Sequence, residues 1–173
     1  MNRIVAFDVE TACHGHIVEL GCVEIVDYVV TGRTLHSYVR PIVKVNPYAQ
    51  AVHGISDYFL RDKPRFSHVM PSLLKFIGDS LILAHNESVE RINLEKELGR
   101  VGKPSFPKER FICSLKMSRQ RGGLDSYKLR DVCQSLGIVD KNLPDLHDAL
   151  RDAEMAARVY LAIQAEKKSK SLL

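Results

Sequence analysis

The N-terminal part of the chain alternates between short apolar runs and polar breaks, which is the spacing of β-strands. Ile4 to Asp8 is an almost wholly apolar run and predicts a strand buried on both faces. Residues 17–26 and 34–39 predict two more strands, and the short turn between them, which ends in Gly32, favours an antiparallel meander. The residues from Pro41 to Pro47 are expected to form a loop.

Farther along the chain the apolar positions fall at helical spacing. Helices are predicted at 66–77, 89–99, 114–121, 129–136 and 147–165, with a short one after Ser56, and buried strands at 81–84 and 111–113. Antiparallel strands followed by strands that alternate with helices predict an α/β domain with one mixed five-stranded sheet flanked by helices. This domain is expected to span residues 1–165, and the basic tail, residues 166–173, to be disordered.

Composition narrows the class of protein without identifying it. The chain has 173 residues, enough for one domain, and its 45% hydrophobic and 27% charged residues are ordinary for a globular protein. It has no apolar run of the ~20 residues that a membrane helix needs, and its N-terminus lacks the pattern of a signal peptide. The net charge of +4 mildly favours a polyanionic partner.

The cysteines favour a reducing compartment. Cys13, Cys22, Cys113 and Cys133 are widely scattered and form no CxxC pair. Such cysteines are expected to be small apolar side chains of a cytoplasmic protein, and to form neither a zinc site nor a disulfide framework. The chain also lacks the phosphate-binding loop of P-loop proteins and the paired motifs of zinc deaminases.

Two carboxylates stand where the first predicted strand ends. Alternation along a strand places the side chains of Asp8 and Glu10 on the same face. In α/β sheets, binding sites lie at the C-terminal ends of strands. By themselves, these two residues fit a divalent-cation site and a solvated strand end equally well.

Further candidates come from two distant stretches. The strand at 81–84 delivers His85 and Asn86 to its C-terminal end, and Glu90 follows in the first turn of the next helix. Near the C-terminus, His147 is expected at or just before a helix start, with Asp152 inside that helix. Each has an ordinary alternative, because helix starts commonly carry acidic or capping residues that bind no ligand.

The segment between Pro47 and Ser56 is too apolar for a plain loop. Val52, His53 and Ile55 form either a wall beside a site or local packing under the loop.

Taken together and in order, these stretches resemble a known family. "FDVET" (7–11), the segment from Leu81 to Glu90 and "LHDALRDA" (146–153) resemble the motifs of DnaQ-like 3′–5′ exonucleases. This family carries an Asp-Glu-Asp-Asp signature plus histidine and includes polymerase proofreading subunits and exonuclease X. "VHGIS" (52–56) resembles the family segment that borders the terminal nucleotide, and the resemblance extends from Ile4 to about Ile163.

The resemblance implies a ribonuclease H-like fold in which Asp8, Glu10, Glu90 and Asp152 converge, with His147 beside them. Carboxylates held so close repel one another, and divalent cations remove that repulsion. Ligation by oxygen alone suits Mg²⁺ or Mn²⁺ rather than zinc. The resemblance therefore implies two such ions held by the carboxylates, with His147 as the general base that deprotonates a water.

The implied reaction is 3′–5′ hydrolysis of single-stranded or frayed DNA, with release of nucleoside 5′-monophosphates. Such enzymes read the strand end and its backbone, so sequence preference is expected to be low. The resemblance also implies a polymerase or another nucleic-acid-processing complex as a partner. The residues expected to contact the terminal nucleotide are Thr11, Val52, His53, Ile55, His85 and Asn86.

One position departs from the family pattern. The family has Phe and Asp at the end of its second motif, where this chain has Val89 and Glu90. Glu90 keeps the charge but adds a methylene, which changes the reach of the carboxylate. This departure leaves open a catalytically weakened subunit that acts mainly by interaction. The same chemistry on RNA is a second alternative, because no residue in the sequence discriminates for or against the 2′-OH.

Overall fold

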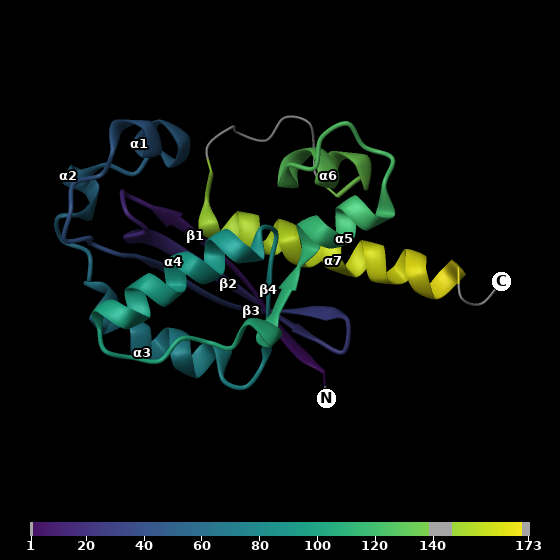
Figure 1. Ribbon diagram of the computed structural model, residues 1–173, viewed down its shortest axis with the longest axis horizontal. Coiled ribbons are helices and arrows are strands. Elements are labelled where there is room, and N and C mark those ends of the chain that lie inside the picture. Colours follow the sequence, from purple (N-terminus) through teal and green to yellow (C-terminus); the bar gives the residue numbers. More distant parts are fainter. Residues whose placement is uncertain (1, 139–146, 171–173) are drawn as a thin grey trace.

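The computed structural model describes residues 2–138 and 147–170. Its centre is a five-stranded sheet with the strand order β3-β2-β1-β4-β5 (Figure 1). The strands are β1 (Arg3–Thr11), β2 (Ile17–Val26), β3 (Val29–Tyr38), β4 (Leu81–Ala84) and β5 (Phe111–Cys113). β1, β2 and β3 form an antiparallel meander, while β4 and β5 run parallel to β1. This is the mixed sheet that the sequence predicts.

Helices cover both faces of the sheet (Figure 1). They are α1 (Pro47–His53), α2 (Asp57–Leu60), α3 (Phe66–Ile77), α4 (Glu87–Arg100), α5 (Ser114–Arg121), α6 (Leu129–Ser135) and α7 (Ala149–Lys170), with a 3₁₀ turn η1 at Lys108–Arg110. One apolar cluster joins the sheet to α3 and α4, and another joins it to α7. α5 and α6 contact α7 on its outer side.

The alternation of β1 decides which side chains meet which helix layer. Phe7 is fully buried in the cluster with α3 and α4, a burial worth about 1.5–3 kcal/mol. Ala6 points the other way and packs in the cluster that contains Ala153 of α7. Asp8 and Glu10 continue the series of Ala6, so they lie on the α7 face at the end of β1.

α7 approaches the sheet most closely at its first residues. A Cβ atom added to Gly21 of β2 would lie 2.4 Å from backbone atoms of Ala149 and Leu150. Gly21 pairs with Asp8 across the sheet. The N–H of Ala149 donates to the buried carboxylate of Glu19, at 3.2 Å from N to Oε2. The start of α7 is thereby held beside the acidic end of β1.

The turn between β2 and β3 lies earlier than the sequence pattern suggests. It is formed by Asp27 and Tyr28, both in the left-handed region with φ of 47° and 67°. Positive φ at both central residues is the geometry of a tight hairpin turn. Gly32, predicted to end the turn, instead lies within β3.

α1 lies where the sequence predicts no helix, because Pro47 is assigned to the end of a loop and the residues after it to a turn-rich segment. The side chain of Asn46 accepts a hydrogen bond from the N–H of Tyr48, Pro47 occupies the first turn, and Gly54 ends the helix with φ of 75°. These are the usual start and stop signals of a helix. The assignment of Pro47 to a loop was therefore wrong. The helix was missed because seven residues are too few to show a clear helical periodicity of apolar positions.

The basic tail is helical in the part that the structure describes. α7 continues to Lys170, so the boundary predicted at residue 165 falls inside this helix. The ammonium of Lys168 lies 3.8 Å from the ring centroid of Tyr28. Residues 171–173 lie outside the described part.

The structure also bears on membrane-spanning helices and on the state of the cysteines. No helix in residues 2–138 and 147–170 is long and apolar enough to cross a membrane. All of the cysteines are free, and Cys22, Cys113 and Cys133 are buried. Burial raises the pKa of the Cys133 thiol to about 12, as expected for an unreactive apolar side chain.

Candidate active site

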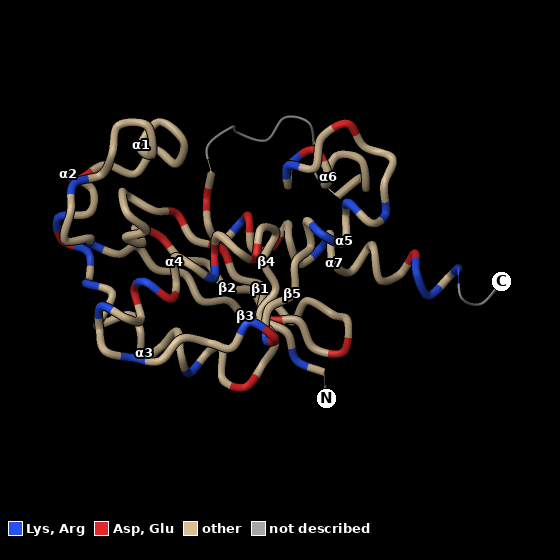
Figure 2. The backbone as a smooth tube through the Cα atoms, in the orientation of Figure 1, with Lys and Arg blue, Asp and Glu red and all other residues tan. Residues whose placement is uncertain are grey.

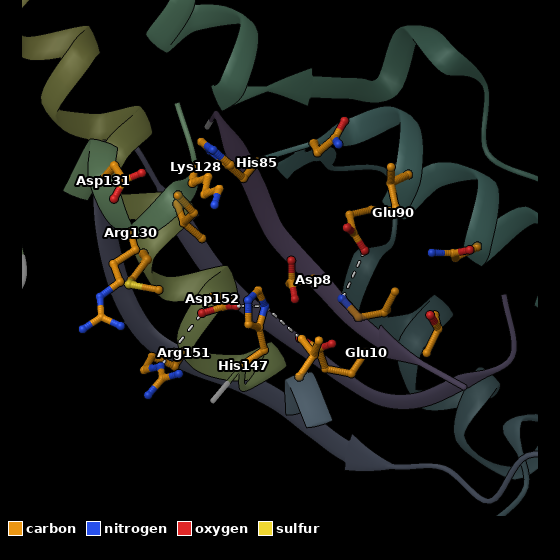
Figure 3. Close-up of a pocket in the computed structure, with 18 residues that line it drawn as sticks. Asp8, Glu10, His85, Glu90, Lys128, Arg130, Asp131, His147, Arg151 and Asp152 are labelled. Atoms are coloured by element: carbon orange, nitrogen blue, oxygen red, sulfur yellow. Dashed lines mark hydrogen bonds and ion pairs between the residues drawn. The ribbon is translucent and has the colours of Figure 1, made fainter. Parts of the chain in front are cut away.

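A cavity of about 760 Å³ opens where β1 and β4 end. Its walls come from the ends of these strands, from α1, from the start of α4, from residues 128–131 and from the start of α7 (Figure 3). Acidic positions gather in this part of the sheet in Figure 2. The predicted site residues that line the cavity are Asp8, Glu10, Thr11, Val52, His85, Asn86, Glu90, His147 and Asp152.

The tightest group in the cavity consists of Glu10, His147 and Asp152. Nδ1 of His147 lies 3.5 Å from Oε1 of Glu10 and 3.2 Å from Oδ2 of Asp152. One ligand atom from each of these residues falls within 4.8 Å of the other two. Asp8 lies between this group and Glu90 in Figure 3. The fold thus brings together side chains that are far apart in the sequence.

Main-chain contacts fix His147 just before α7, as the sequence predicts. The N–H of His147 donates to the carbonyl of Val52 in α1, at 3.1 Å. Asp148 is positioned as the cap of α7, because its side chain accepts a hydrogen bond from the N–H of Arg151. Asp152 lies in the first turn of α7. The cap therefore sets the spacing between His147 and Asp152.

Glu90 reaches the site from α4, on the opposite side of the sheet. Its Oε2 accepts a hydrogen bond from the N–H of Val9 at 3.2 Å, and the residue is buried. β4 pairs with β1 only at Ile4 to Ala6, so the β4 side of β1 has no paired strand at Val9 to accept this hydrogen bond. The carboxylate of Glu90 takes the place of that missing strand carbonyl.

Burial and mutual repulsion disfavour the charged forms of the acids. The pKa of Asp8 is raised well above its usual range by burial and then by the charges of Glu90, Asp152 and Glu10. The pKa of Glu90 is raised to about 8, chiefly by burial. Hydrogen bonds to Asp152 and Glu10 raise the pKa of His147 to about 10. A cluster of oxygen donors with so much uncompensated repulsion fits divalent cations of the Mg²⁺ type.

Of the residues predicted to contact the nucleotide between Val52 and Ser56, one lines the cavity and the others pack in the interior. Val52 lines the cavity and is 46% exposed. His53 is buried, and its Nδ1 accepts a hydrogen bond from the N–H of Ile55 at 3.0 Å. Ile55 belongs to an apolar cluster with Val18 and Leu60. The structure therefore does not bring His53 and Ile55 into the cavity wall.

The two predicted residues after β4 differ in their environment. Asn86 is exposed beside the cavity, and its side chain accepts a hydrogen bond from Ser88. His85 is buried, and both of its ring nitrogens have protein partners, Ser114 and the carbonyl of Tyr127. His85 is therefore suited to holding the cavity wall together.

Several lining residues were not expected from the sequence. They are Val9, Val89, Asn93, Lys128, Leu129, Arg130, Asp131, Arg151 and Met155. Residues 128–131 lie at the start of a predicted helix and carry no local pattern that indicates a site. Tertiary contacts bring them to the cavity: the packing of α6 against α7 and the hydrogen bond between His85 and the carbonyl of Tyr127.

Comparison with known proteins places these features in a family. A family model described as an exonuclease matches residues 5–160. DNA polymerase III subunit epsilon of Salmonella typhimurium is 34% identical over 176 residues, which cover 94% of this chain and 72% of that protein. The corresponding subunit of Rickettsia prowazekii is 34% identical over 175 residues, which cover 96% of this chain and 76% of that protein.

Solved structures are similar over nearly the whole chain. A structure of exonuclease X in complex with 5′ overhanging duplex DNA matches with a TM-score of 0.74 and 28% identity, covering 96% of this chain and 92% of that one. The nuclease domain of 3′hExo, a DEDDh family member bound to rAMP, matches with a TM-score of 0.79 and 16% identity, covering 95% and 92%. The second likeness concerns the fold alone.

Proposed function

Because the chain belongs to the DnaQ-like family of exonucleases, we propose that it hydrolyses single-stranded or frayed DNA from the 3′ end and releases nucleoside 5′-monophosphates. The observation that carries this proposal is the grouping of Glu10, His147 and Asp152 in one cavity with Asp8 and Glu90. Phosphodiester hydrolysis needs this combination of oxygen ligands and a proton acceptor.

The carboxylates of Asp8, Glu10, Glu90 and Asp152 are proposed to hold two Mg²⁺ or Mn²⁺ ions. Bound there, the ions would lower the pKa of a water and stabilise the attacking and leaving oxygens of the phosphodiester. The donor set supports this assignment, since burial, and after it the charges of the neighbouring carboxylates, raises the pKa values of Asp8 and Glu90.

His147 is proposed to accept the proton of the attacking water. Its side chain is 56% exposed, so it faces the space in which a substrate would lie. The high pKa of His147 comes from its hydrogen bonds to Asp152 and Glu10. Once those carboxylates are occupied as ligands, the imidazole loses the cause of the shift and its pKa moves back toward neutrality, where a general base is most effective.

Glu90 is proposed to support activity despite its unexpected length. The added methylene lets one carboxylate oxygen bind the N–H of Val9 while the other remains available to the cavity. The competing proposal, a subunit that acts mainly by interaction, gains some support from this bond because it ties up one oxygen. The relatives named as polymerase subunits support a polymerase or another nucleic-acid-processing complex as the partner.

The test is release of nucleotides from a single-stranded DNA labelled at either its 3′ or its 5′ end, with Mg²⁺, Mn²⁺ or EDTA. We expect immediate release of labelled mononucleotide only from the 3′-labelled strand, and none in EDTA. Asp8→Asn should abolish release, because it removes a ligand from the centre of the cavity. Absence of release with either ion would overturn the proposal, and a matched RNA strand decides between the two nucleic acids.

A further inference from the structure

One wall of the cavity carries a lysine that the proposed reaction does not use. Lys128 lies on the cavity wall just before α6, and it is exposed. Within residues 2–138 and 147–170, the ammonium of Lys128 has no hydrogen-bond or ion-pair partner. Figure 3 places Lys128 on the same side of the cavity as His85, across from Glu90. The described part of the chain therefore leaves this cation available to the space in which a strand would bind.

His85 determines where this lysine stands. Its Nε2 lies 2.9 Å from the carbonyl oxygen of Tyr127, the residue before Lys128, and its Nδ1 lies 3.0 Å from Oγ of Ser114. A carbonyl only accepts, so Nε2 carries the proton, and Nδ1 of the neutral ring accepts from the Ser114 hydroxyl. Burial lowers the pKa of His85, which favours this neutral form.

The anchor joins three segments that are distant in the sequence. His85 follows β4, Ser114 is the fully buried first residue of α5, and Tyr127 precedes α6. Ser126 bonds to Asp131 and to the N–H of Lys128, which lie in the same segment. The contact with His85 is by contrast a hydrogen bond that ties this wall to the end of the sheet.

The charge distribution suggests what Lys128 would bind. The floor of the cavity consists of carboxylates, which repel the phosphates of a nucleic acid wherever no cation stands between them. A lysine on the cavity wall supplies such a cation. Its ammonium is a compact charge that can bind a phosphate in several orientations.

We propose that Lys128 binds a backbone phosphate of the single strand, and that His85 is a positioning residue that holds Lys128 at the cavity. This inference rests on the proposed function, because it assigns a contact to the substrate of the same site. It also changes the expected role of His85 from touching the nucleotide to supporting a residue that does.

The first test measures binding of a 5′-fluorescein single strand whose 3′ end is protected by phosphorothioate linkages, in Mg²⁺ and at several salt concentrations. Lys128→Gln should weaken binding and lower the slope of log Kd against log salt by about 0.7, the value for one phosphate contact on a single strand. Lys103→Gln removes the same charge from an exposed loop outside the cavity and should leave the slope unchanged. Equal slopes for the two variants would overturn the proposal.

The second test asks whether His85 acts through Lys128. His85→Ala should raise KM more than it lowers kcat, and adding Lys128→Gln to it should raise KM little further. His85→Gln keeps an N–H for the Tyr127 carbonyl and should recover part of the loss. If Lys128→Gln keeps its full effect on KM in the His85→Ala background, the positioning role is rejected.

The two tests separate this inference from the proposed function. If the wild-type protein releases nucleotides but the Lys128 and Lys103 variants bind the strand alike, the phosphate contact fails and the exonuclease stands. If the strand binds with the predicted Lys128 dependence but unprotected strands stay intact, the exonuclease proposal fails and the contact stands.

Discussion

Gly21 and Ala149 touch across the interface between the sheet and α7, where a Cβ atom on Gly21 would lie 2.4 Å from the carbonyl group of Ala149. Because Gly21 pairs with Asp8, and His147 and Asp152 flank Ala149 in sequence, this contact sets the distance between the two halves of the acidic cluster. A small residue that does not itself line the cavity thus controls the geometry of the site.

Gly21→Ala is expected to destabilise the protein and to reduce activity together. Overpacking at a backbone contact costs about 1–3 kcal/mol, and the start of α7 must move away from Asp8 to relieve it. Thermal unfolding and the rate of nucleotide release measure the two effects. Gly99→Ala is the matched control, since nothing lies within 4 Å of its added Cβ, and a helical alanine should leave stability unchanged or raise it by up to about 1 kcal/mol.

Variants of Glu90 should separate its hydrogen bond from its charge. Glu90→Asp shortens the side chain, so the bond to the Val9 N–H is expected to be lost at a cost of about 1 kcal/mol, with lower activity. Glu90→Gln keeps an acceptor for Val9 and should retain stability in EDTA while losing metal-dependent activity. Higher activity in Glu90→Asp than in the wild type would instead show that the longer side chain weakens the enzyme.

Stability in EDTA should fall as the pH rises from 6 to 9. The folded-state pKa of Glu90 is raised to about 8, so folding retains a proton that the unfolded chain has already lost, and the free energy of unfolding decreases with pH. His147, raised to about 10, acts in the same direction, because its contribution is complete below its unfolded pKa and is lost as the pH rises through the folded value.

Melting temperatures at several pH values, with EDTA or Mg²⁺, test this linkage. The decrease of the melting temperature with pH in EDTA should be smaller in Glu90→Gln. The stabilisation by Mg²⁺ should be larger at pH 8 than at pH 6, since the carboxylates are less protonated at the higher pH. A melting temperature in EDTA that rises between pH 6 and 9 is incompatible with these pKa shifts.

His147→Asn should lower kcat by roughly 10²–10⁴-fold, the usual contribution of a positioned general base, and it should also lower thermal stability in EDTA because it removes a cation beside Glu10 and Asp152. His14→Asn serves as the control. His14 lies outside the cavity with φ of 55°, a conformation that asparagine tolerates well. A similar loss of kcat in both variants would argue against His147 as the base.

Much of the site could be predicted because several of its residues are placed by short stretches of the sequence. The alternation of β1 places Asp8 and Glu10 on one face, the strand at 81–84 carries His85 and Asn86 to its end, and these positions agree with the structure. β5 and α5 also begin and end at the predicted residues. Such features depend on residues close together in the chain, because the spacing of their apolar side chains indicates which face of a strand or helix is buried in the core.

What the sequence by itself determined is therefore the order of the strands and of the helices other than α1, and the acidic side chains of the candidate site. Only the tertiary structure decided that Glu90 bonds to Val9, that Ile55 packs in an apolar cluster away from the cavity lining and that Lys128 lies at the cavity. Each of these depends on a contact between segments that are far apart along the chain. No local pattern encodes such distances, because they follow from how closely the helices pack on the sheet.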